Sequence, residues 1–410
     1  MVVSEPALPR LEALDVDNRR VFVRVDFNVP ITKSGLVRDD TRIRAALPTL
    51  RLLRDRDAKL ILASHLGRPK GPDPRLSLEP VAARLAELLD TEVRLPDEVV
   101  GDGVRKLVLD TRAGQVILLE NLRFHPGETK NDPAFAAALA ALADIYVNDA
   151  FGASHRAHAS VVGVPGLLHE RAPGLLLRAE IEALRRVVHD PERPFAAIVG
   201  GAKVSDKLPV LHALVDRLVA GDRLLIGGAM ANTFLAASGM AIGASLHEPD
   251  QFSACVNLLA RARARDVRIQ LPVDVRVGAS VQADHARVVP AGPEAHGLAD
   301  NELALDIGPH TAAAFARAIA DARTVFWNGP MGLFENPAFA EGTLDLARAV
   351  AECPGFTVVG GGDSVAAVQE SGVAEHINHI STGGGAALEM IEGKILPGVA
   401  ALYPSEPRGA

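Results

Sequence analysis

Arginine-bearing loops follow apolar runs in the first half of the chain, where they read DTRIRA, SHLGRPKG, LRFHPGE and SHRAHAS. The second half carries lysine- and glycine-rich loops instead, VGGAKVSDK, FWNGPMGLFE, VVGGGDS and STGGGAALE. Planar guanidinium groups suit a small ligand with carboxylate and phosphate groups, whereas helix-start amides and a lysine suit a nucleotide polyphosphate. This asymmetry predicts two facing anion sites and indicates phosphoryl-transfer chemistry.

An aspartate and an asparagine stand in the motif RVDFNVP near the start of the chain. Asp26 and Asn28 alternate with apolar residues, so they share one face of an extended segment. Side chains of these types can hold sugar-like hydroxyl groups. A turn at the end of a strand is the commoner reason for such a pair, so both interpretations stay open.

Five further side chains of the first half are typical of an anion site. The loop SHLGRPKG puts His65 and Arg68 on one short segment, which a glycine bends and Pro69 stiffens. Three other loops add the guanidinium groups of Arg42, Arg123 and Arg156. A single loop arginine is usually a solvated surface residue, but several at corresponding strand ends repel one another unless an anion lies between them. We therefore expect a ligand with two anionic groups, such as a phosphorylated carboxylic acid.

Three histidines, His125, His155 and His158, are further candidates for the same site. Each is equally well explained as a hydrogen-bonded or exposed histidine. No pair of them has the partner residues that a zinc site needs.

Two lysines follow the first predicted strand of the second half. The motif VGGAKVSDKL opens a predicted helix that Ser205 can cap, and Lys203 and Lys207 stand four residues apart around its start. Both can then reach phosphate oxygens near the positive end of the helix. The G-x-x-x-x-G-K-[ST] spacing of a Walker A loop is missing, so this is not a simple P-loop.

Two glycine-rich helix starts complete the second set. In VVGGGDS, the residues Gly360, Gly361 and Gly362 allow close backbone approach, and Asp363 is well placed for Mg²⁺. STGGGAALE offers a second start of this kind. One triple glycine can serve only to turn the chain, but two such starts together with paired lysines favour a nucleotide site.

Short apolar runs alternate with longer helical patterns along the chain. This alternation predicts parallel sheets, whose ligands bind beyond the carboxyl ends of the strands, where nearly every motif above lies. The strands predicted in the first half are Arg20–Pro30, Lys59–Gly67, Val116–Phe124 and Asp144–Gly152. Those predicted in the second half are Phe195–Gly200, Leu224–Gly227, Ile269–Val273, Thr324–Trp327, Thr357–Val359 and His379–Ser381.

Two of the predicted helices carry clear start signals. The segment SLEPVAARLAELL places apolar residues on one face, with Ser77 available as its cap. In NDPAFAAALAALA, Asp132 can cap the helix and Pro133 takes the first helical position, where the missing amide hydrogen costs nothing.

At 410 residues the chain is too long for one ordinary core. We predict an α/β protein with two doubly wound, parallel-sheet (Rossmann-like) domains facing a cleft and joined by an interdomain helix. The junction is the helical pattern LLLRAEIEALRRVVHDPERP, with the main boundary near Pro191.

Composition excludes several classes of protein. The formal net charge of −8 argues against a nucleic-acid binder, whose footprint is basic. Cys255 and Cys353 lack metal-ligand spacing and fit a reducing compartment. The N-terminal segment has no signal-peptide pattern, and the uncharged stretch from Leu224 to Leu246 is better explained as strand, turn and helix than as a membrane span. We expect a cytoplasmic protein without a membrane or nucleic-acid partner.

The ordered set of motifs closely resembles that of phosphoglycerate kinase, over almost the entire chain. The resemblance rests on RVDFNVP, SHLGRPKG, LENLRFHPGE, NDAFGASHRAHAS, VGGAKVSDKL, FWNGPMGLFE, GGGDS and STGGGAALEMIEGKILPGVAAL. It implies reversible phosphoryl transfer between 1,3-bisphosphoglycerate with ADP and 3-phosphoglycerate with ATP, with Mg²⁺ and a monomer as the family default. It also implies a substrate domain over 1–174, an interdomain helix over 175–190, a nucleotide domain over 191–395, and a tail over 396–410 that packs on the first domain.

Residue roles carry over at matching positions. The resemblance implies that the glycerate substrate is bound by Asp26, Asn28, Arg42, His65, Arg68, Arg123 and Arg156. The catalytic residues that it implies are Arg42, Lys203, Gly362 and Gly384. Among these, Lys203 would stabilise the phosphoryl group in flight, and backbone amides near the two glycines would meet that group.

The nucleotide site implied by the resemblance is a larger set. It comprises Gly201, Lys203, Lys207, Gly227, Gly228, Asn328, Glu335, Gly361, Gly362, Asp363 and Ser364. Lys207 would contact the phosphates, with Asn328 nearby, and Asp363 would hold Mg²⁺. Glu335 would bind the ribose, and two glycines would line the base pocket.

Two departures from the family pattern stand out. His310 follows DIGP, where lysine, serine or glutamate is usual, and Arg178 and Ala179 replace an acidic and basic pair in the junction helix. The first puts the nearby nucleotide pocket in doubt, and the second puts the energetics of domain closure in doubt.

Two other functions compete with this interpretation. A dinucleotide-dependent dehydrogenase would need a G-x-G-x-x-G with a suitably spaced acidic residue, which is lacking. A catalytically silent nucleotide-binding scaffold with the same fold is the second alternative, since fold does not guarantee activity. The intact Lys203, Asp363 and arginine set argues against it.

Overall fold

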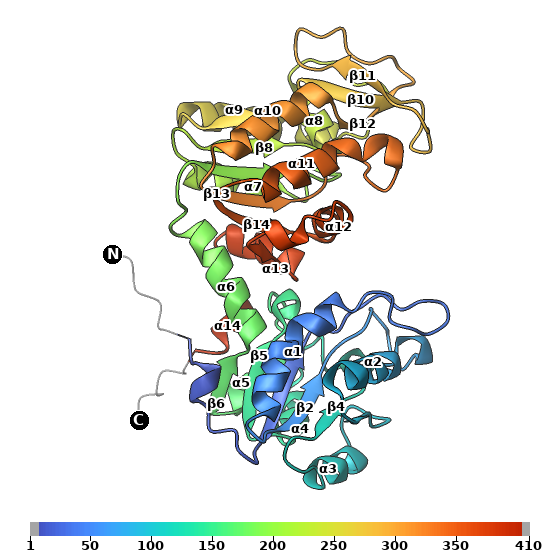
Figure 1. The fold of residues 1–410 in the computed structure, drawn as a ribbon, viewed down its shortest axis with the longest axis vertical. Helices are drawn as coiled ribbons and strands as arrows, with labels where there is room; N and C mark the ends of the chain where they lie inside the picture. Colours follow the sequence, from blue (N-terminus) through green and yellow to red (C-terminus); the bar gives the residue numbers. More distant parts are fainter. Residues whose placement is uncertain (1–7, 404–410) are drawn as a thin grey trace. The chain divides into compact units, whose positions relative to one another are not determined.

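The computed structural model describes residues 8–403, which form two compact units (Figure 1). Unit 1 runs to Ile181 and resumes at Ile395, and unit 2 comprises Glu182–Lys394. The first residues of the N-terminal segment, 1–7, and the end of the predicted tail, 404–410, lie outside the described range.

Unit 1 is built on a six-stranded sheet in which every pairing is parallel. Its spatial order is β3-β4-β2-β1-β5-β6, so the winding direction reverses beside β1, as in a doubly wound fold. The strands are β1 (Arg20–Val25), β2 (Lys59–Ala63), β3 (Val93–Arg94), β4 (Val116–Leu118), β5 (Ile145–Asp149) and β6 (Glu170–Pro173).

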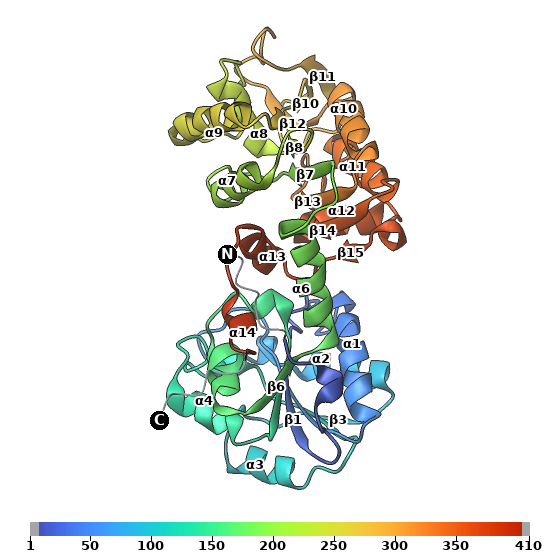
Figure 2. The same cartoon turned by 90° about the vertical axis from the view of Figure 1, so that its left-hand side faces the viewer.

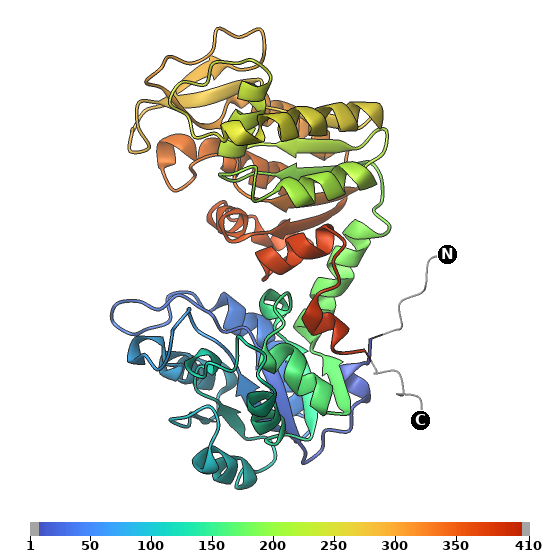
Figure 3. The ribbon, with the colours of Figure 1, turned by 180° about the vertical axis from the view of Figure 1, so that it is seen from behind.

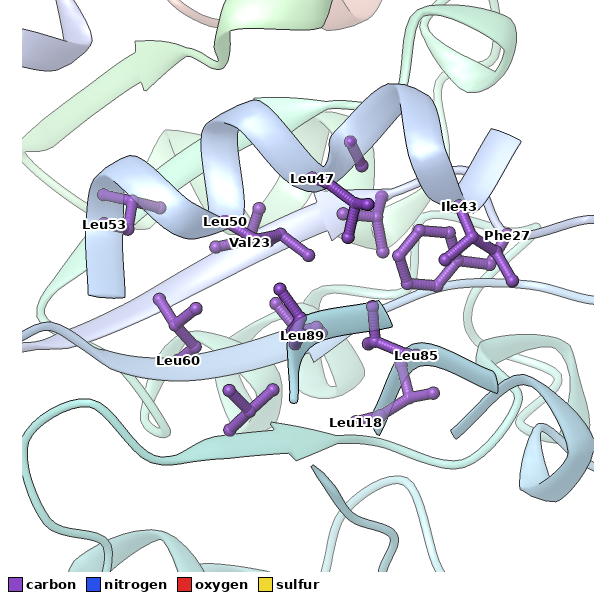
Figure 4. Close-up of a cluster of buried hydrophobic side chains, with 14 of the residues drawn as sticks. Val23, Phe27, Ile43, Leu47, Leu50, Leu53, Leu60, Leu85, Leu89 and Leu118 are labelled. Carbon is purple, nitrogen blue, oxygen red and sulfur yellow. The ribbon is translucent and has the colours of Figure 1, made fainter. Parts of the chain in front are cut away.

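Helices cover both faces of this sheet, with α1 (Thr41–Arg54) and α2 (Glu79–Leu89) on one side and α4 (Pro133–Ala140) on the other (Figure 2). Figure 4 shows Leu47 and Leu50 of α1 pointing toward Val23 and Leu60 of the strands. The same unit contains α3 (Asp102–Leu109) and α5 (Val164–Leu167). These apolar stripes recur every three or four residues, which is why the segments fold as helices over a buried sheet.

The predicted helix caps have different outcomes. The side chain of Asp132 accepts a hydrogen bond from the amide of Phe135 at 2.8 Å, which confirms the predicted cap of α4. Ser77 accepts from the amide of Glu79 at 3.2 Å, but the residue at the N-cap of α2 is Leu78. There the distant carboxylate of Glu120 accepts from the Leu78 amide and the Ser77 hydroxyl, a contact that local sequence does not reveal.

Unit 2 contains a second six-stranded sheet, again with parallel pairings throughout, in the order β15-β14-β13-β7-β8-β9. Its strands are β7 (Phe195–Val199), β8 (Arg223–Ile226), β9 (Arg268–Gln270), β13 (Thr324–Asn328), β14 (Phe356–Gly360) and β15 (His379–Ile380). The parallel α/β architecture predicted from strand and helix alternation is therefore confirmed in both units.

Helices flank this second sheet as they flank the first. In Figure 2, α7 (Leu208–Arg217), α9 (Phe252–Ala264) and α13 (Gly384–Ile391) lie on one side, and α10 (Pro309–Ala320), α11 (Glu341–Ala351) and α12 (Gly362–Glu370) lie on the other. The central Trp327 is fully buried among the side chains of β7, α10 and α11. The sheet is therefore covered on both faces, as parallel sheets require.

A separate antiparallel sheet of three strands was not predicted. It pairs β10 (Asp274–Gly278) with β11 (Arg287–Pro290) and β12 (Leu303–Ile307) and buries a small apolar cluster of its own. The strands are short, and only one residue of β11 is buried, so their pattern is weak beside the long apolar runs of the parallel strands.

Helix α6 (Leu175–Val188) contains the point where one unit ends and the other begins. Its first turn is tied to unit 1, because the amide of Leu175 donates to the hydroxyl of Thr49 at 2.9 Å. Near its other end, the guanidinium of Arg186 lies 4.1 Å from the ring centre of Phe356 in unit 2. Each half of the helix therefore has an anchor in its own unit.

The chain returns to unit 1 after Ile395, through the short helix α14 (Pro397–Ala400). The amide of Gly398 donates to the carbonyl of Ser154 at 2.9 Å, and Arg171 donates to the carbonyl of Tyr403 at 2.6 Å. Figure 3 shows this red segment against the green part of unit 1.

The uncharged stretch from Leu224 to Leu246 folds as β8, a turn and α8 (Ala229–Ala237), as predicted. Across residues 8–403, the structure contains no helix with the length and apolar character to cross a membrane.

A fully buried carboxyl group, that of Asp149, lies at the start of α6. It is the last residue of β5, and its Oδ1 accepts a hydrogen bond from the amide of Leu177 at 3.2 Å, while its Oδ2 has no partner in the described part of the chain. Burial raises the pKa of Asp149 to about 7, although hydrogen bonds from Thr49 and from α6 amides oppose that rise. The folded chain therefore holds this proton more tightly than the unfolded chain, whose aspartates titrate at a pKa of about 3.9.

We expect this group to make stability depend on pH. A raised folded-state pKa contributes stability that is fully present below about pH 4 and is lost as the pH rises through about 7. Relative to an Asp149→Asn variant, wild-type protein is expected to lose about 2 kcal/mol of unfolding free energy between about pH 5 and pH 8. Urea unfolding across this pH range measures the difference in unfolding free energy. Asp132→Asn is the control, because it changes an aspartate that caps α4 and is not fully buried. A difference between wild type and Asp149→Asn that stays constant with pH would contradict the expectation.

Candidate active site

The predicted glycerate residues of unit 1 come together at one edge of its sheet. Asp26 follows β1, His65 follows β2, Arg123 follows β4 and Arg156 follows β5. These four strands are neighbours in the order β4-β2-β1-β5, and their pairings are parallel. Because parallel strands end at the same edge, residues scattered through the sequence converge beside the point where the winding reverses.

Asp26 is surrounded by positive charge. Its Oδ2 accepts from Nη1 of Arg42 at 3.1 Å, and its Oδ1 lies 3.9 Å from Nδ1 of His65. Burial alone would raise the pKa of Asp26, but the neighbours His65, Arg42 and Arg24 hold it below the ordinary value. Since burial also keeps the pKa of His65 well below its ordinary value, His65 is neutral at pH 7 and the two arginines provide the effect. Asp26 is therefore an ionised acceptor.

Asn28 serves the structure of the site at least in part. Its Oδ1 accepts from the amide of Gly67 at 2.9 Å, and its backbone carbonyl accepts from Arg42 at 3.4 Å. The carboxamide oxygen thus fixes the loop that carries Arg68. The turn interpretation is supported separately, because the amide of Asn28 donates to Oδ1 of Asp26 at 3.3 Å. No hydrogen bond within the described residues uses the Nδ2 group of Asn28, which is left for a ligand.

The guanidinium groups of this edge repel one another. Burial lowers the pKa of Arg123 to about 10, and the charges of Arg156 and Arg24 add to that effect. Burial likewise lowers the pKa of Arg156, with the charge of Arg68 as the next cause. Arg68 itself is exposed. A cation cluster whose members lower one another's pKa values gains free energy when an anion binds among them.

Sequence reasoning missed Arg24, which belongs to the strand that leads into the site. Its side chain is fully buried, and its Nε donates to Oγ of Ser160 at 2.8 Å while its Nη2 lies 3.1 Å from Nδ1 of His65. Ser160 in turn donates to Oε1 of the buried Glu128 at 2.6 Å. A charged residue between valines in the motif RVDFNVP was the available signal, because such a residue is seldom buried without a partner.

The histidines near this edge differ in role. His125 stacks on Phe135 with ring centres 3.9 Å apart, and its Nδ1 accepts from the amide of Gly127 at 3.1 Å, so it is structural. Burial and the nearby arginines lower the pKa of His158 to about 4, and its Nδ1 lies 3.7 Å from Oε1 of Glu128. His155 accepts from Nε of Arg156 at 3.2 Å. His155 and His158 thus lie beside the cluster.

In unit 2 the predicted nucleotide residues lie at or after the ends of five strands of one parallel sheet. Lys203 and Gly228 follow β7 and β8, and Asn328 is the last residue of β13. Gly362 and Gly384, the second of which is a predicted catalytic residue, are the first residues of the helices that follow β14 and β15. Asn328 is buried, and its Oδ1 accepts from Nζ of Lys207 at 2.5 Å while its Nδ2 has no partner in the described range. An orphaned donor beside a lysine is typical of an anion site.

The two lysines have unequal surroundings. Burial lowers the pKa of Lys207, although Asp206 and Asp363 oppose that change. Lys203 is exposed, and no ion pair to it is found within the described residues. The prediction that Ser205 caps the helix was wrong, because α7 begins only at Leu208 and the Ser205 hydroxyl donates to Glu248 at 2.6 Å. The motif therefore forms a turn before the helix rather than its first turn.

Glycines let these loops approach closely. Gly228 has a φ of +70°, and a methyl group on it would lie 2.6 Å from the amide nitrogen of Gly201. A methyl group on Gly384 would lie 2.9 Å from the Cα of Gly361, so packing alone accounts for both glycines. Gly362 differs, since a methyl group there would meet nothing within 4 Å. Packing therefore does not explain the glycine at the first residue of α12.

Other predicted nucleotide residues fall into two groups. Ser364 is buried, and its hydroxyl accepts from the amide of Gly329 at 2.6 Å, so it braces the loop after β13. A methyl group on Gly227 would lie 2.3 Å from the sulfur of Met331, which again indicates packing. Glu335 and Asp363 are exposed and available to a ligand.

The described residues contain no cluster of three histidine, cysteine or acidic side chains that could hold a metal ion. Asp363 therefore does not form an all-protein metal site. A single exposed carboxylate at a helix start fits Mg²⁺ that is shared with the phosphate oxygens of a bound nucleotide.

The departures from the family pattern have contacts of their own. His310 is exposed in the first turn of α10, where its amide donates to Asp274 at 3.0 Å. Arg178 of α6 pairs with Glu12 at 3.0 Å, and Ala179 is exposed. The arginine thus has a role of its own within unit 1.

Comparison with known proteins supports a single family. The family model "Phosphoglycerate kinase" matches residues 11–394. The chain is 53% identical to a phosphoglycerate kinase of Anaeromyxobacter sp. (strain Fw109-5), over 97% of this chain and 99% of that protein. It is 55% identical to the corresponding protein of Moorella thermoacetica, over 96% of this chain and 98% of the relative.

Solved structures agree with the sequence comparison. The structure of phosphoglycerate kinase from Coxiella burnetii superposes with a TM-score of 0.86 at 39% identity, over 97% of this chain and 99% of that chain. The enzyme from Pyrococcus horikoshii OT3 gives a TM-score of 0.83 at 35% identity, with coverage of 96% and 98%.

Proposed function

This chain belongs to the phosphoglycerate kinase family, and on that premise we propose which of its residues carry the reaction. The protein is a glycolytic kinase that transfers a phosphoryl group reversibly between 1,3-bisphosphoglycerate and ADP, giving 3-phosphoglycerate and ATP. The observation that carries the assignment of roles is the cluster of mutually repelling guanidinium groups at one sheet edge of unit 1.

We propose that this cluster binds the glycerate substrate. Arg68, Arg123 and Arg156 would neutralise its phosphate and carboxylate groups, and Arg42 would act from the Asp26 side. Asp26, as an ionised acceptor, suits a substrate hydroxyl, and the remaining binding residues are Asn28 and His65. Charge and burial at this edge support the proposal.

The nucleotide would bind at the carboxyl edge of the unit 2 sheet. Lys207 and the orphaned amide of Asn328 would contact its phosphates, and Glu335 would bind its ribose. The base would lie near Gly227 and Gly228, with the backbone of Gly201, Gly361 and Ser364 lining the phosphates. Asp363 would hold Mg²⁺ together with phosphate oxygens, and the bound ion would supply neutralising charge.

The reaction needs no general base. The acceptor is an ADP phosphate oxygen in one direction and a carboxylate in the other, and a carboxylate with a pKa of roughly 4 is already ionised at neutral pH. Catalysis would therefore rest on in-line alignment and charge neutralisation. Lys203, Arg42 and the amides near Gly362 and Gly384 are the proposed groups that meet the phosphoryl group.

Turnover tests the function directly. ADP formation from MgATP is measured with and without 3-phosphoglycerate, while a coupled reaction removes the acyl-phosphate product. Turnover that needs both 3-phosphoglycerate and Mg²⁺ is the expected result. Binding of both ligands without turnover would instead identify a catalytically silent scaffold.

Replacing Arg42 with alanine is expected to weaken binding of 3-phosphoglycerate by roughly tenfold, since a charge-assisted contact to an anion is worth about 1.5–3 kcal/mol. The affinity for MgATP should stay within about twofold. Calorimetric titration of each ligand measures both effects. Arg44→Ala, two residues away and paired with Asp40 at 2.7 Å, is the matched control. Unchanged affinity for 3-phosphoglycerate would contradict the placement of Arg42.

We propose a substrate domain over 1–174, an interdomain helix over 175–190, a nucleotide domain over 191–395 and a returning tail over 396–410, of which 404–410 lie outside the described range. We propose that transfer brings the two ligands together and excludes water. X-ray scattering is expected to give a smaller radius of gyration with 3-phosphoglycerate and a non-hydrolysable ATP analogue together than with either alone. An unchanged radius would contradict closure.

A cytoplasmic location and a monomeric state complete the proposal. The two cysteines are free, which suits a reducing compartment. Light scattering at several protein concentrations tests the monomer.

A further inference from the structure

The loop that carries Lys203 is anchored at one end by backbone contacts. The amide of Gly201 donates to the carbonyl of Pro330 at 3.1 Å, and the Gly201 carbonyl accepts from the amide of Met230 at 3.0 Å. Ala202 and Lys203, which follow, are both exposed. The direction of the Lys203 side chain therefore depends on what holds the next residues.

Glu248 holds the segment that follows Lys203, through two hydrogen bonds from Ser205. Its Oε2 accepts from the amide of Ser205 at 3.0 Å, and its Oε1 accepts from the Ser205 hydroxyl at 2.6 Å. Burial opposes ionisation of this carboxyl group, but the hydrogen bonds from Ser205 and the charge of Lys203 hold the pKa of Glu248 below its ordinary value. The acceptor is thus charged at neutral pH, and charge-assisted bonds of this kind are the stronger ones.

Glu248 has firm support of its own. Its amide donates to the hydroxyl of the buried Thr233 on α8 at 3.1 Å. Two residues earlier, the carbonyl of Leu246 accepts from Asn232 of the same helix at 3.2 Å. Helix α8 begins directly after Gly228, so the contact links the lysine loop to a rigid element of the sheet edge.

We propose that Glu248 is a positioning residue for Lys203. Its carboxylate fixes Ser205 and hence the backbone that aims Lys203, and its negative charge attracts the lysine side chain while no phosphoryl group is present. This inference rests on the role proposed for Lys203 in phosphoryl transfer. A displacement of about 1 Å at a catalytic group can lower a rate by up to a hundredfold, so the contact has a measurable consequence.

Glu248→Ala is expected to lower kcat about tenfold while the KM for 3-phosphoglycerate stays within about twofold. Glu248→Gln keeps an acceptor oxygen and should restore part of the loss. Ser205→Ala is expected to lower kcat about threefold. The double variant should be no slower than Glu248→Ala alone, because the Ser205 hydroxyl has no carboxylate to bond once Glu248 is removed.

Glu302→Ala is the matched control, since Glu302 also accepts a backbone amide, that of Ala299 at 3.0 Å, but does not contact the lysine loop. Hydrogen exchange at the amides of residues 204–207 should become faster in Glu248→Ala and not in Glu302→Ala. This second measurement reports the contact without turnover, so an inactive wild type would overturn the proposed function and leave this inference testable.

Three results would overturn the inference. They are a kcat within about twofold of wild type in Glu248→Ala, additive effects in the double variant, and unchanged amide exchange in the loop. If Glu248→Ala fails to fold, the kcat of Ser205→Ala is the test of the inference. An unchanged kcat in Ser205→Ala would overturn it.

Discussion

Replacing Lys203 with alanine is expected to lower kcat by roughly a hundredfold or more, which is the scale of losing one preorganised charge contact to a transition state. Lys203 is exposed and has no ion-pair partner within the described residues, so its loss removes little from the fold. Its ammonium group is free to approach the charge on the phosphoryl group in transfer. The effect should therefore appear in kcat and in kcat/KM alike, with a similar KM for 3-phosphoglycerate.

Steady-state assays with the product-removing system measure these constants. Lys106→Ala, an exposed lysine on α3 in the other unit, is the matched control and should leave kcat unchanged. A Lys203→Ala variant whose KM for MgATP rises while its kcat is preserved would contradict the catalytic role. Such a result would make Lys203 a ground-state binding group instead.

Replacing Arg24 with methionine is expected to lower the free energy of unfolding by about 3–5 kcal/mol, the usual cost of removing one partner from a buried charged network. Arg24 and Glu128 are both fully buried and are joined through Ser160. Methionine fills a similar volume, so the loss arises mainly from the uncompensated Glu128 carboxylate. Urea unfolding at pH 7 measures it.

The double variant Arg24→Met with Glu128→Gln removes both charges and should recover a large part of the lost stability. Arg44→Met changes an exposed arginine on α1 and should have little effect. Equal destabilisation by the single and double variants would contradict the expectation, because it would show that packing, and not charge, dominates at this position.

The fold could be predicted where apolar runs are long. The ten predicted strands all begin at or within one residue of strands in the structure. Their ends were set too late in the first half, where β1 stops at Val25 although Phe27 and Val29 are buried. Burial continues beyond the strand because the loop packs into the core, and hydrophobicity alone cannot separate the two.

The sequence could predict which segments form the candidate site, but not which side chains bond to one another within it. Residues at and after the carboxyl ends of neighbouring parallel strands lie at one edge of the sheet, so the places of Arg123 and Asn328 followed from the order of the motifs. The partners of Ser205, Arg24 and Ser77 lie 43, 136 and 43 residues away in the chain. Such pairs depend on tertiary structure, and no local pattern specifies them.

The returning segment after Ile395 has a consequence for biosynthesis. Because Gly398 and Tyr403 bond to Ser154 and Arg171, the first unit is completed by residues that are synthesised after the whole of the second unit. The intervening unit is contiguous and has its whole sequence available earlier. Although domains usually fold in the order of their synthesis, here the nascent first unit stays incomplete until the second unit and the returning segment have been synthesised.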